Sequence, residues 1–261
     1  MTANHLDRLV ASALDQMASR AARVSLPEIK ARALAQPAPR GFASALATAK
    51  GRAIIAEVKR ASPSRGAIAP DLDPARLAAA YERGGAACMS VLTDRANFSG
   101  SLEDLVAARN ACSLPVLRKD FLVTPYQLWE ARAYGADAVL LIAAALAPAQ
   151  LHELRTLARE LELDVLLEVH DERELGVAQA AAPELLGINA RNLKTLTVDP
   201  ETFARLASRA KQIAPLVAES GVRSPADVRR YVQLGASALL IGQALSAAPD
   251  PEAATRALVR A

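Results

Sequence analysis

Short apolar runs of strand length in this chain repeatedly end on a charged or amide side chain, after which a loop begins. The first run, at residues 53–58, meets Glu57 and Lys59, and a later one ends on Lys119. Isolated buried charges are costly, so such strand ends need a shared polar environment. In a parallel barrel the carboxyl ends of all strands meet at one mouth, where active sites lie. The pattern therefore predicts both an architecture and the place of the chemistry.

Eight such runs recur from residue 53 onward, and helix-like segments separate them. We predict strands at residues 53–58, 87–92, 115–119, 137–142, 164–169, 185–190, 214–219 and 237–242. Alternating strands and helices are typical of α/β folds with a parallel sheet. The periodicity alone permits a doubly wound open sheet, but eight units with polar strand ends favour a closed (β/α)8 TIM barrel.

Proline directly after a potential capping side chain marks five expected helix starts. The pairs are Asp73-Pro74, Thr124-Pro125, Asp199-Pro200, Ser224-Pro225 and Asp250-Pro251. A capping oxygen accepts a hydrogen bond from a free backbone N–H, and proline at the first helical position loses no bond. Asp171 and Glu174 have the spacing of a capping box. We therefore expect helices to begin at these six points.

Residues 1–50 differ from the repeating part of the chain. Residues 4–17 have amphipathic helical spacing, a proline-punctuated segment follows, and residues 42–47 read as a short helix. We therefore divide the chain into an N-terminal helical extension, residues 1–50, and a barrel domain, residues 51–261.

Composition narrows the class of partner. No apolar run approaches the ~18 residues needed to span a bilayer, and the first ten residues lack the features of a signal peptide. We expect a cytoplasmic protein with no membrane partner, in which Cys88 and Cys112 stay reduced. A net charge of +3 with scattered basic residues and 3% aromatics suits an anionic small molecule better than nucleic acid. The three histidines show no metal-ligand spacing, and His170 is interpreted as a loop residue.

Lys119 is the single residue that most strongly indicates a functional role, because the chain has only six lysines against 25 arginines. At a strand end it could serve as a general acid, a Schiff-base nucleophile or a phosphate clamp. Glu168 ends another apolar run and could face Lys119 or Lys59 across the mouth. Glu57 and Lys59 lie two apart on one strand face, where they can form an acid/base pair or a structural ion pair.

Other strand ends carry groups suited to binding. Asn189 and Arg191 share a strand face, and an arginine fork suits a substrate carboxylate. Glycines follow the last two predicted strands, in Glu219-Ser220-Gly221 and in Gly242-Gln243. Barrels often bind phosphate at these two loops, where glycine lets backbone N–H groups approach an anion.

Two further groups complete the predicted site. The Ser62-Pro63-Ser64 segment after the first strand could add donors to the same anion. Phe98 and Phe121, with Leu140, could form an apolar wall for an aromatic part of the substrate, or could simply pack in the core.

Taken together, these segments resemble indole-3-glycerol-phosphate synthase of tryptophan biosynthesis over essentially the whole chain. The resemblance rests on AEVKRASPSRG (56–66), SVLTDRANFSGSLEDL (90–105), LRKDF (117–121), GADAVLLI (135–142), LLEVHDERE (166–174), GINARNLKTLTVD (187–199), AESGV (218–222) and LLIGQAL (239–245). It implies ring closure, decarboxylation and dehydration of 1-(2-carboxyphenylamino)-1-deoxyribulose 5-phosphate, with no metal or organic cofactor. It also implies that residues 1–50 pack over the barrel mouth.

The resemblance assigns roles position by position. Lys119 matches the general acid, Glu168 a residue that stabilises the developing cation or handles protons, and Glu57 with Lys59 the pair tied to dehydration. Residues matching positions that hold the substrate's hydroxyl and carboxylate groups are Asn189, Arg191, Glu219 and Ser220. Residues matching the phosphate cradle are Gly221, Gly242 and Gln243. The chain departs from the family pattern at Asn97, Gln243 and Ser246, none of which belongs to the proposed acid/base set.

Two alternatives compete with this interpretation. Another sugar-phosphate barrel, such as a phosphoribosylanthranilate isomerase, typically needs a cysteine and an aspartate, and no cysteine ends a strand here. A non-catalytic barrel that binds a phosphate metabolite would not need Lys119, Glu168 and Glu57. We expect a monomer, with a weak homodimer as the alternative.

Overall fold

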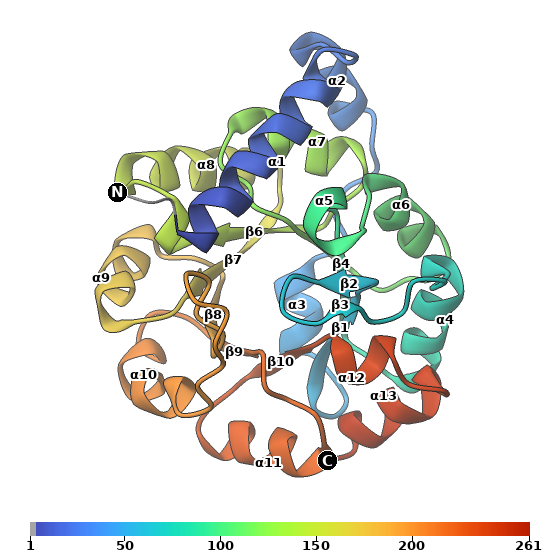
Figure 1. Ribbon diagram of the computed structural model, residues 1–261, viewed down its shortest axis with the longest axis vertical. Coiled ribbons are helices and arrows are strands. Elements are labelled where there is room, and N and C mark those ends of the chain that lie inside the picture. The colour runs from blue at the N-terminus through green and yellow to red at the C-terminus, as the bar shows by residue number, and fades with distance from the viewer. Residues whose placement is uncertain (1–3) are drawn as a thin grey trace.

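The computed structural model describes residues 4–261, and eight parallel strands close into a barrel with helices outside it (Figure 1). The barrel strands are β1 (Ala53–Val58), β4 (Cys88–Leu92), β5 (Val116–Lys119), β6 (Ala138–Ile142), β7 (Asp164–Val169), β8 (Leu185–Asn189), β9 (Leu216–Glu219) and β10 (Ala238–Ile241). Each strand pairs with its sequence neighbours, and β1 closes the ring against β10. The predicted (β/α)8 TIM barrel is therefore confirmed, with strand bounds within about two residues of those expected.

Alternation along the strands divides the core into two apolar layers. In β1, Ile54 and Ala56 pack with the layer between the strands and the outer helices. Ala53 and Ile55 instead pack with the interior of the barrel. Because side chains alternate along a strand, the next interior position is Glu57. The strand period thus turns a carboxylate into the barrel at its carboxyl end.

Most connecting helices begin where the capping pairs predict. The helices after β1 are α4 (Pro74–Gly84), α5 (Arg95–Phe98), α6 (Leu102–Asn110), α7 (Pro125–Ala133), α8 (Pro148–Glu160), α9 (Glu172–Ala181), α10 (Thr202–Ala210), α11 (Pro225–Gln233), α12 (Gln243–Ser246) and α13 (Pro251–Val259), with a 3-10 turn η1 (Ala143–Ala145) after β6. Asp73, Thr124, Ser224 and Asp250 occupy the expected N-cap positions. A hairpin of β2 (Ala61–Ser62) and β3 (Gly66–Ala67), which the sequence pattern missed, follows β1.

Two predicted helix starts differ in detail. Helix α10 begins at Thr202 with Glu201 as its N-cap residue, while the Asp199 side chain accepts a hydrogen bond from the Glu201 N–H and pairs with Arg205. Asp171 caps α9, but the carboxylate of Glu174 accepts the backbone N–H of His170 instead of closing a capping box. In the second case the His170 N–H competes with the Asp171 N–H as the donor to Glu174.

The N-terminal extension is spread over both ends of the barrel. Its helices are α1 (His5–Ala21), α2 (Leu26–Leu34) and α3 (Phe42–Ala47), and residues 1–3 lie outside the described part. The sequence predicted α1 and α3 but treated α2 as a proline-punctuated connection. Pro27 instead lies in the first turn of α2, where proline is compatible with a helix. Helix α2 packs its buried face on α7.

Helix α1 crosses the carboxyl end of the barrel (Figure 1). Its Gln16 contacts the loop after β4, donating to Asp94 and accepting the N–H of Arg95. Arg20 binds the buried Glu130 of α7 through both carboxylate oxygens, at 2.6 and 2.9 Å. Glu130 in turn pairs with the fully buried Arg118 of β5 at 2.9 Å. This buried chain of charges ties α1 to the strand that ends in Lys119.

Helix α3, in contrast, closes the amino end of the barrel. The Ala43 N–H donates to Asp164, the first residue of β7, at 2.8 Å. The carbonyl of the fully buried Phe42 accepts from Cys88, the first residue of β4. Residues 42–47 therefore do not pack over the mouth as the resemblance implied, because their apolar side chains fill the open bottom of the barrel.

Candidate active site

Four alternate strands supply one layer of charged side chains at the carboxyl end of the barrel. Glu57 comes from β1, Lys119 from β5, Glu168 from β7 and Glu219 from β9. Alternate strands contribute the side chains of each interior layer in this fold, so these four converge. The three carboxylates are each at most 2% exposed. The predicted strand-end residues thus form a compact, mostly water-excluded cluster.

Lys119 lies between two of these carboxylates. Its Nζ is 2.7 Å from Glu219 Oε2 and 3.1 Å from Glu168 Oε2. Burial alone would lower the pKa of Lys119, but the carboxylates of Glu219, Glu168 and Glu57 more than offset it and raise the pKa above the ordinary lysine value. Lys119 is therefore an ammonium group with a fixed direction, pointing into the mouth.

The two carboxyl groups on Lys119 differ in charge state. Burial raises the pKa of Glu219 to about 8, because the attraction of Lys119 is opposed by the neighbouring Glu168. Burial also disfavours the Glu168 anion, yet Lys119 and then His170 lower the pKa of Glu168 below its ordinary value. One lysine cannot neutralise two buried carboxylates, so one of them keeps a proton near neutral pH.

Glu57 and Lys59 form a second ion pair beside the first. Lys59 Nζ donates to Glu57 Oε1 at 3.1 Å, and it also lies 5.8 Å from the centre of the Phe98 ring. A hydroxyl fixes the backbone between the two residues. Ser246 Oγ donates to the Glu57 carbonyl at 2.7 Å and accepts the Lys59 N–H at 3.1 Å. The family departure at Ser246 therefore has a structural role, which its sequence position alone did not reveal.

We expect Ser246→Ala to lower the free energy of unfolding by about 1–3 kcal/mol, because the Lys59 N–H loses its partner. The Glu57 carbonyl keeps the hydrogen bond that it accepts from Tyr81. Urea denaturation measures the loss, with Ser208→Ala on the exposed face of α10 as the matched control. Equal urea midpoints for the two variants would show that the Ser246 hydroxyl contributes nothing to this strand end.

Two glycines make room for buried carboxylates. A Cβ on Gly187 of β8 would overlap Glu219 Oε1, and a Cβ on Gly242 would overlap Glu57 Oε1. Gly242 was predicted only as part of a phosphate cradle, and the structure shows a second reason for a glycine there, which is the space that Glu57 needs. Gly187 was not singled out from the sequence, although its place two residues before Asn189 on the same strand face was available.

The predicted apolar wall lies against the charged cluster. Phe121 is 6% and Leu140 is 2% exposed, and both belong to the interior apolar layer. Phe98, half-buried at the end of α5, stands 6.4 Å from the Phe121 ring centre in a tilted arrangement. Asn97, where a second aromatic is common in the family, bonds to Ser12 of α1 instead. Phe98 therefore belongs to the apolar wall and also lies beside the ammonium group of Lys59.

The other predicted binding residues lie on loops after β8, β9 and β10. Asn189 Oδ1 accepts the Arg191 N–H at 2.9 Å, which fixes the turn after β8. Arg191 is half-buried, and its Nη1 donates to the Leu196 carbonyl at 2.8 Å. Ser220 and Gly221 follow Glu219 with φ of 65° and 86°, so this turn has left-handed backbone at two successive residues.

Two predicted phosphate contacts lie on other loops at the same end of the barrel. Gln243 begins α12 with an exposed side chain, and Ser62 is buried in β2. The residues predicted from strand ends therefore lie either in the cluster or on the loops that surround it.

The sequence interpretation missed the contact of His170 with Glu168. Its Nε2 lies 3.1 Å from Glu168 Oε1, and its Nδ1 lies 3.1 Å from Glu174 Oε2. Burial alone would lower the pKa of His170, but the two carboxylates raise it to about 10. The available sequence signal was its position two residues after Glu168, which follows the end of the same strand.

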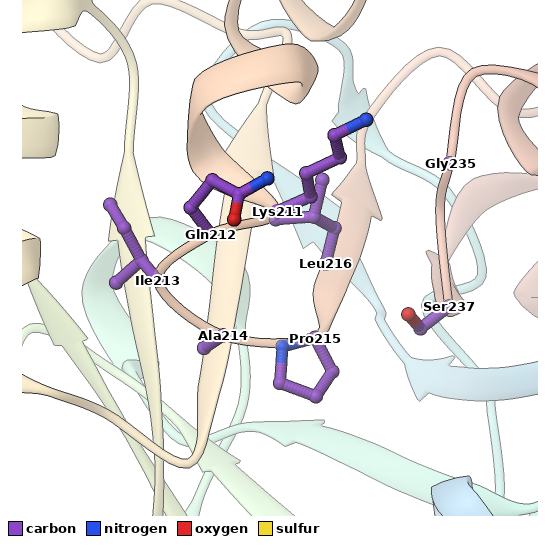
Figure 2. Close-up of a pocket in the computed structure, with 8 residues that line it drawn as sticks. All are labelled: Lys211, Gln212, Ile213, Ala214, Pro215, Leu216, Gly235 and Ser237. Atoms are coloured by element: carbon purple, nitrogen blue, oxygen red, sulfur yellow. The ribbon is translucent and has the colours of Figure 1, made fainter.

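A separate cavity of about 300 Å³ opens at the other end of the barrel (Figure 2). It is lined by Lys211, Gln212, Ile213, Ala214, Pro215, Leu216, Gly235 and Ser237. Leu216 is the first residue of β9, and Ser237 directly precedes β10. The cavity therefore lies at the amino ends of these strands, away from the charged cluster.

Residues 4–261 contain neither a metal-type cluster nor a membrane-spanning helix. Within these residues, no group of three or more His, Cys, Asp or Glu side chains has the arrangement of a metal site. In the same part of the chain, no helix is long and apolar enough to cross a membrane.

A family model described as "Indole-3-glycerol phosphate synthase" matches residues 6–258. The chain belongs to the indole-3-glycerol phosphate synthase family. It is 50% identical over 260 residues to the indole-3-glycerol phosphate synthase of Mycolicibacterium gilvum, covering 100% of this chain and 95% of that one. It is 51% identical over 257 residues to indole-3-glycerol phosphate synthase 1 of Streptomyces coelicolor, covering 98% and 95%.

Solved structures agree on the fold. A 3-hexulose-6-phosphate synthase superposes with a TM-score of 0.64 at 17% identity, covering 79% of this chain and 97% of that one. A thiamine phosphate pyrophosphorylase from Pyrococcus furiosus superposes with a TM-score of 0.59, also at 17% identity, covering 80% and 94%. At this identity the likeness establishes the barrel alone. Family membership identifies the activity as that of a carboxy-lyase in tryptophan biosynthesis.

Proposed function

We propose that the charged cluster at the barrel mouth converts 1-(2-carboxyphenylamino)-1-deoxyribulose 5-phosphate into indole-3-glycerol phosphate. The observation that carries this proposal is the direct contact of Lys119 with both Glu168 and Glu219. The reaction closes the five-membered ring, releases carbon dioxide and then releases water. Ring closure and dehydration move protons at carbon or oxygen, for which a lysine between carboxylates is suited.

Lys119 acts first, as the general acid of ring closure. The aromatic carbon that bears the carboxylate attacks the carbonyl carbon, and it is a weak nucleophile because this attack interrupts the aromaticity of the benzene ring. Donation from Nζ to the carbonyl oxygen lowers that barrier, and a placed general acid contributes about 10²–10⁴-fold. Glu219, 2.7 Å from Nζ, can return a proton when it holds one.

The remaining carboxylates serve the later steps. Ring closure places positive charge on the substrate nitrogen and ring, which the Glu168 anion stabilises across the mouth. Loss of carbon dioxide follows, and its electron pair neutralises that cation. Glu57 and Lys59, paired at 3.1 Å, then remove a proton and protonate the departing hydroxyl during dehydration.

Loops around the cluster hold the rest of the substrate. Asn189, Arg191 and Ser220 bind its hydroxyl and carboxylate groups, while Phe98, Phe121 and Leu140 receive the aromatic ring. The phosphate is bound by Ser62, Gly221, Gly242 and Gln243, mainly through backbone N–H groups. Binding energy from this remote phosphate helps to hold the flexible chain in the folded shape that closure needs.

We expect Arg191→Ala to raise KM about tenfold or more while kcat falls less, because a charged hydrogen bond to the substrate carboxylate is lost. Steady-state kinetics separates the two constants. Arg229→Ala, on the exposed face of α11, is the matched control. An unchanged KM would remove Arg191 from substrate binding.

Indole fluorescence during incubation of the purified protein with the carboxyphenylamino-deoxyribulose phosphate tests the proposed function, with chelator present and no added metal. The proposal expects a rising signal in the wild-type chain and in the Arg229→Ala control. Saturable binding of the substrate without any indole signal would contradict it and favour a non-catalytic phosphate-binding barrel.

The organisation of the protein completes the proposal. We propose a cytoplasmic monomer that uses no metal or organic cofactor and binds neither nucleic acid nor membrane. The even mixture of basic and acidic residues, 31 against 28, supports a small-molecule partner. Residue 50 is the proposed boundary between the helical extension and the catalytic barrel.

A further inference from the structure

The contacts of Lys119 do not by themselves distinguish Glu168 from Glu219. Glu168 and Glu219 both contact the same Nζ, at 3.1 and 2.7 Å, and both are nearly fully buried. By these contacts alone the two carboxyl groups are almost equivalent. A single lysine balances one anion, so the proton that the pair retains could reside on either. Something outside the pair has to break the symmetry.

His170 supplies that asymmetry. Its Nε2 lies 3.1 Å from Glu168 Oε1, on the side of the carboxylate that does not face Lys119. Glu168 Oε1 and Glu219 Oε1 are both buried without a hydrogen bond among the described residues, but of the two only Glu168 Oε1 has an imidazole nitrogen within ion-pair distance. Glu168 therefore has a second cationic neighbour, and Glu219 does not.

The charge of His170 follows from its own surroundings. Both ring nitrogens face carboxylate oxygens at 3.1 Å, Nε2 facing Glu168 and Nδ1 facing Glu174. A neutral imidazole would leave a lone pair beside one of these carboxylates, whereas the imidazolium is protonated on both nitrogens and its positive charge attracts both carboxylates. Glu174 is fixed on α9 because it also accepts the His170 backbone N–H at 2.8 Å. The side chain of His170 is only 10% exposed, so water screens these charges weakly.

We propose that His170, anchored by Glu174, is a positioning residue that keeps Glu168 ionised and so makes Glu219 the proton-carrying carboxyl beside Lys119. The proposal rests on the proposed function, which gives Glu168 the role of the anion and Glu219 the role of a proton donor to Lys119. It explains why Glu168 and Glu219, which make similar contacts with Lys119, have different roles.

The titratable groups around this chain of contacts are few. Glu168 faces Lys119 from β5 and lies near Glu219 of β9, and His170 faces Glu174 of α9. The two carboxylates raise the pKa of His170 to about 10, above an ordinary value of 6.5. The stability that the His170 cation contributes is thus fully present below about pH 6.5 and is lost as pH rises toward 10.

The pH dependence of kcat/KM in His170→Gln tests the proposal. Glutamine keeps a polar side chain of similar size but has no charge, and an opposite charge at this distance lowers a carboxyl pKa by about 1–3 units. We expect the acid-side midpoint of the profile to move up by about one pH unit or more. His152→Gln, on the exposed face of α8, should keep the wild-type profile. An unchanged midpoint, or an equal loss of activity at every pH, would overturn the proposal.

A second measurement does not depend on turnover or on folding of the variant. Ring nitrogen NMR of the wild-type chain, with His5 and His152 assigned by their glutamine variants, follows His170 through the titration. We expect the His170 ring to stay doubly protonated above pH 8, and titration near the ordinary value of about 6.5 would overturn the proposal. If no variant or wild-type chain forms indole product, the proposed function fails, and this titration still decides whether His170 is the cation beside Glu168.

Discussion

Lys119→Met is expected to lower kcat by about a thousandfold, because ring closure loses the acid that protonates the carbonyl oxygen. Methionine approximates the length of lysine and removes only the charge and the donor. Two buried carboxylates would then lack their shared cation, and Glu219 would take up a proton more readily. Glu168 keeps its contact with His170 at 3.1 Å. The fold is therefore expected to persist, at a cost in stability that grows as pH rises through the range where Glu219 ionises.

Indole fluorescence and calorimetric binding of the substrate measure this variant. Lys211→Met, exposed at the end of α10, is the matched control and should retain wild-type kcat. Binding of the substrate should weaken far less than turnover, since the phosphate and carboxylate contacts lie on other loops. Turnover within tenfold of wild type would exclude Lys119 as the general acid.

Gly187→Ala is expected to lower kcat about a hundredfold, although the substitution adds one methyl group that never touches the substrate. The new Cβ would occupy the place of Glu219 Oε1, and Leu166 Cδ1 lies 3.3 Å away on another side. Glu219 is only 2% exposed, and the overlap with the new Cβ is expected to displace its carboxylate from Lys119. A displacement of about 1 Å at a catalytic group can cost 10²-fold. Overpacking is also expected to reduce the free energy of unfolding by about 1–3 kcal/mol.

Gly176→Ala provides a sharp control for this variant. Gly176 lies on the exposed face of α9, and a Cβ there would have no neighbour within 4 Å. That substitution should leave kcat unchanged and stabilise the protein by up to about 1 kcal/mol, because alanine favours helix more than glycine does. Wild-type turnover in Gly187→Ala would show that Glu219 does not need its present position.

The importance of Lys119 can be predicted from the sequence, whereas the importance of Gly187 can be predicted only from the structure. Lys119 stands out in the sequence, because a lysine at a strand end is unusual in a chain with so few lysines. Gly187 does not stand out, since a glycine in a strand has many explanations. Its importance depends on the distance from its Cα to a carboxylate on the next strand, β9, which pairs Gly187 with Val217. No local sequence pattern contains that distance.

Ser246 and His170 illustrate the same limit. Ser246 is interpreted from the sequence as a packing variation, yet it bonds the Glu57 carbonyl and the Lys59 N–H, 189 and 187 residues earlier in the chain. From the sequence, His170 is interpreted as a loop residue, because no other histidine lies at metal-ligand spacing from it. Its partners are Glu168, two residues before it, and Glu174, four residues after it. Only the turn between β7 and α9 brings the three together.

The sequence by itself determined the strand and helix order, the closed barrel and the identity of most charged residues at its mouth. It could do so because strand and helix periods, capping pairs and strand-end charges are local properties, and alternation along a strand fixes which side chains face inward. Tertiary structure alone decided the separation of α1 and α3 to opposite ends of the barrel, the space that Gly187 and Gly242 leave, and the charge states of Glu168 and Glu219. These depend on burial and on distances between segments far apart in the chain, where the electrostatic energy of a group is set by its neighbours in space.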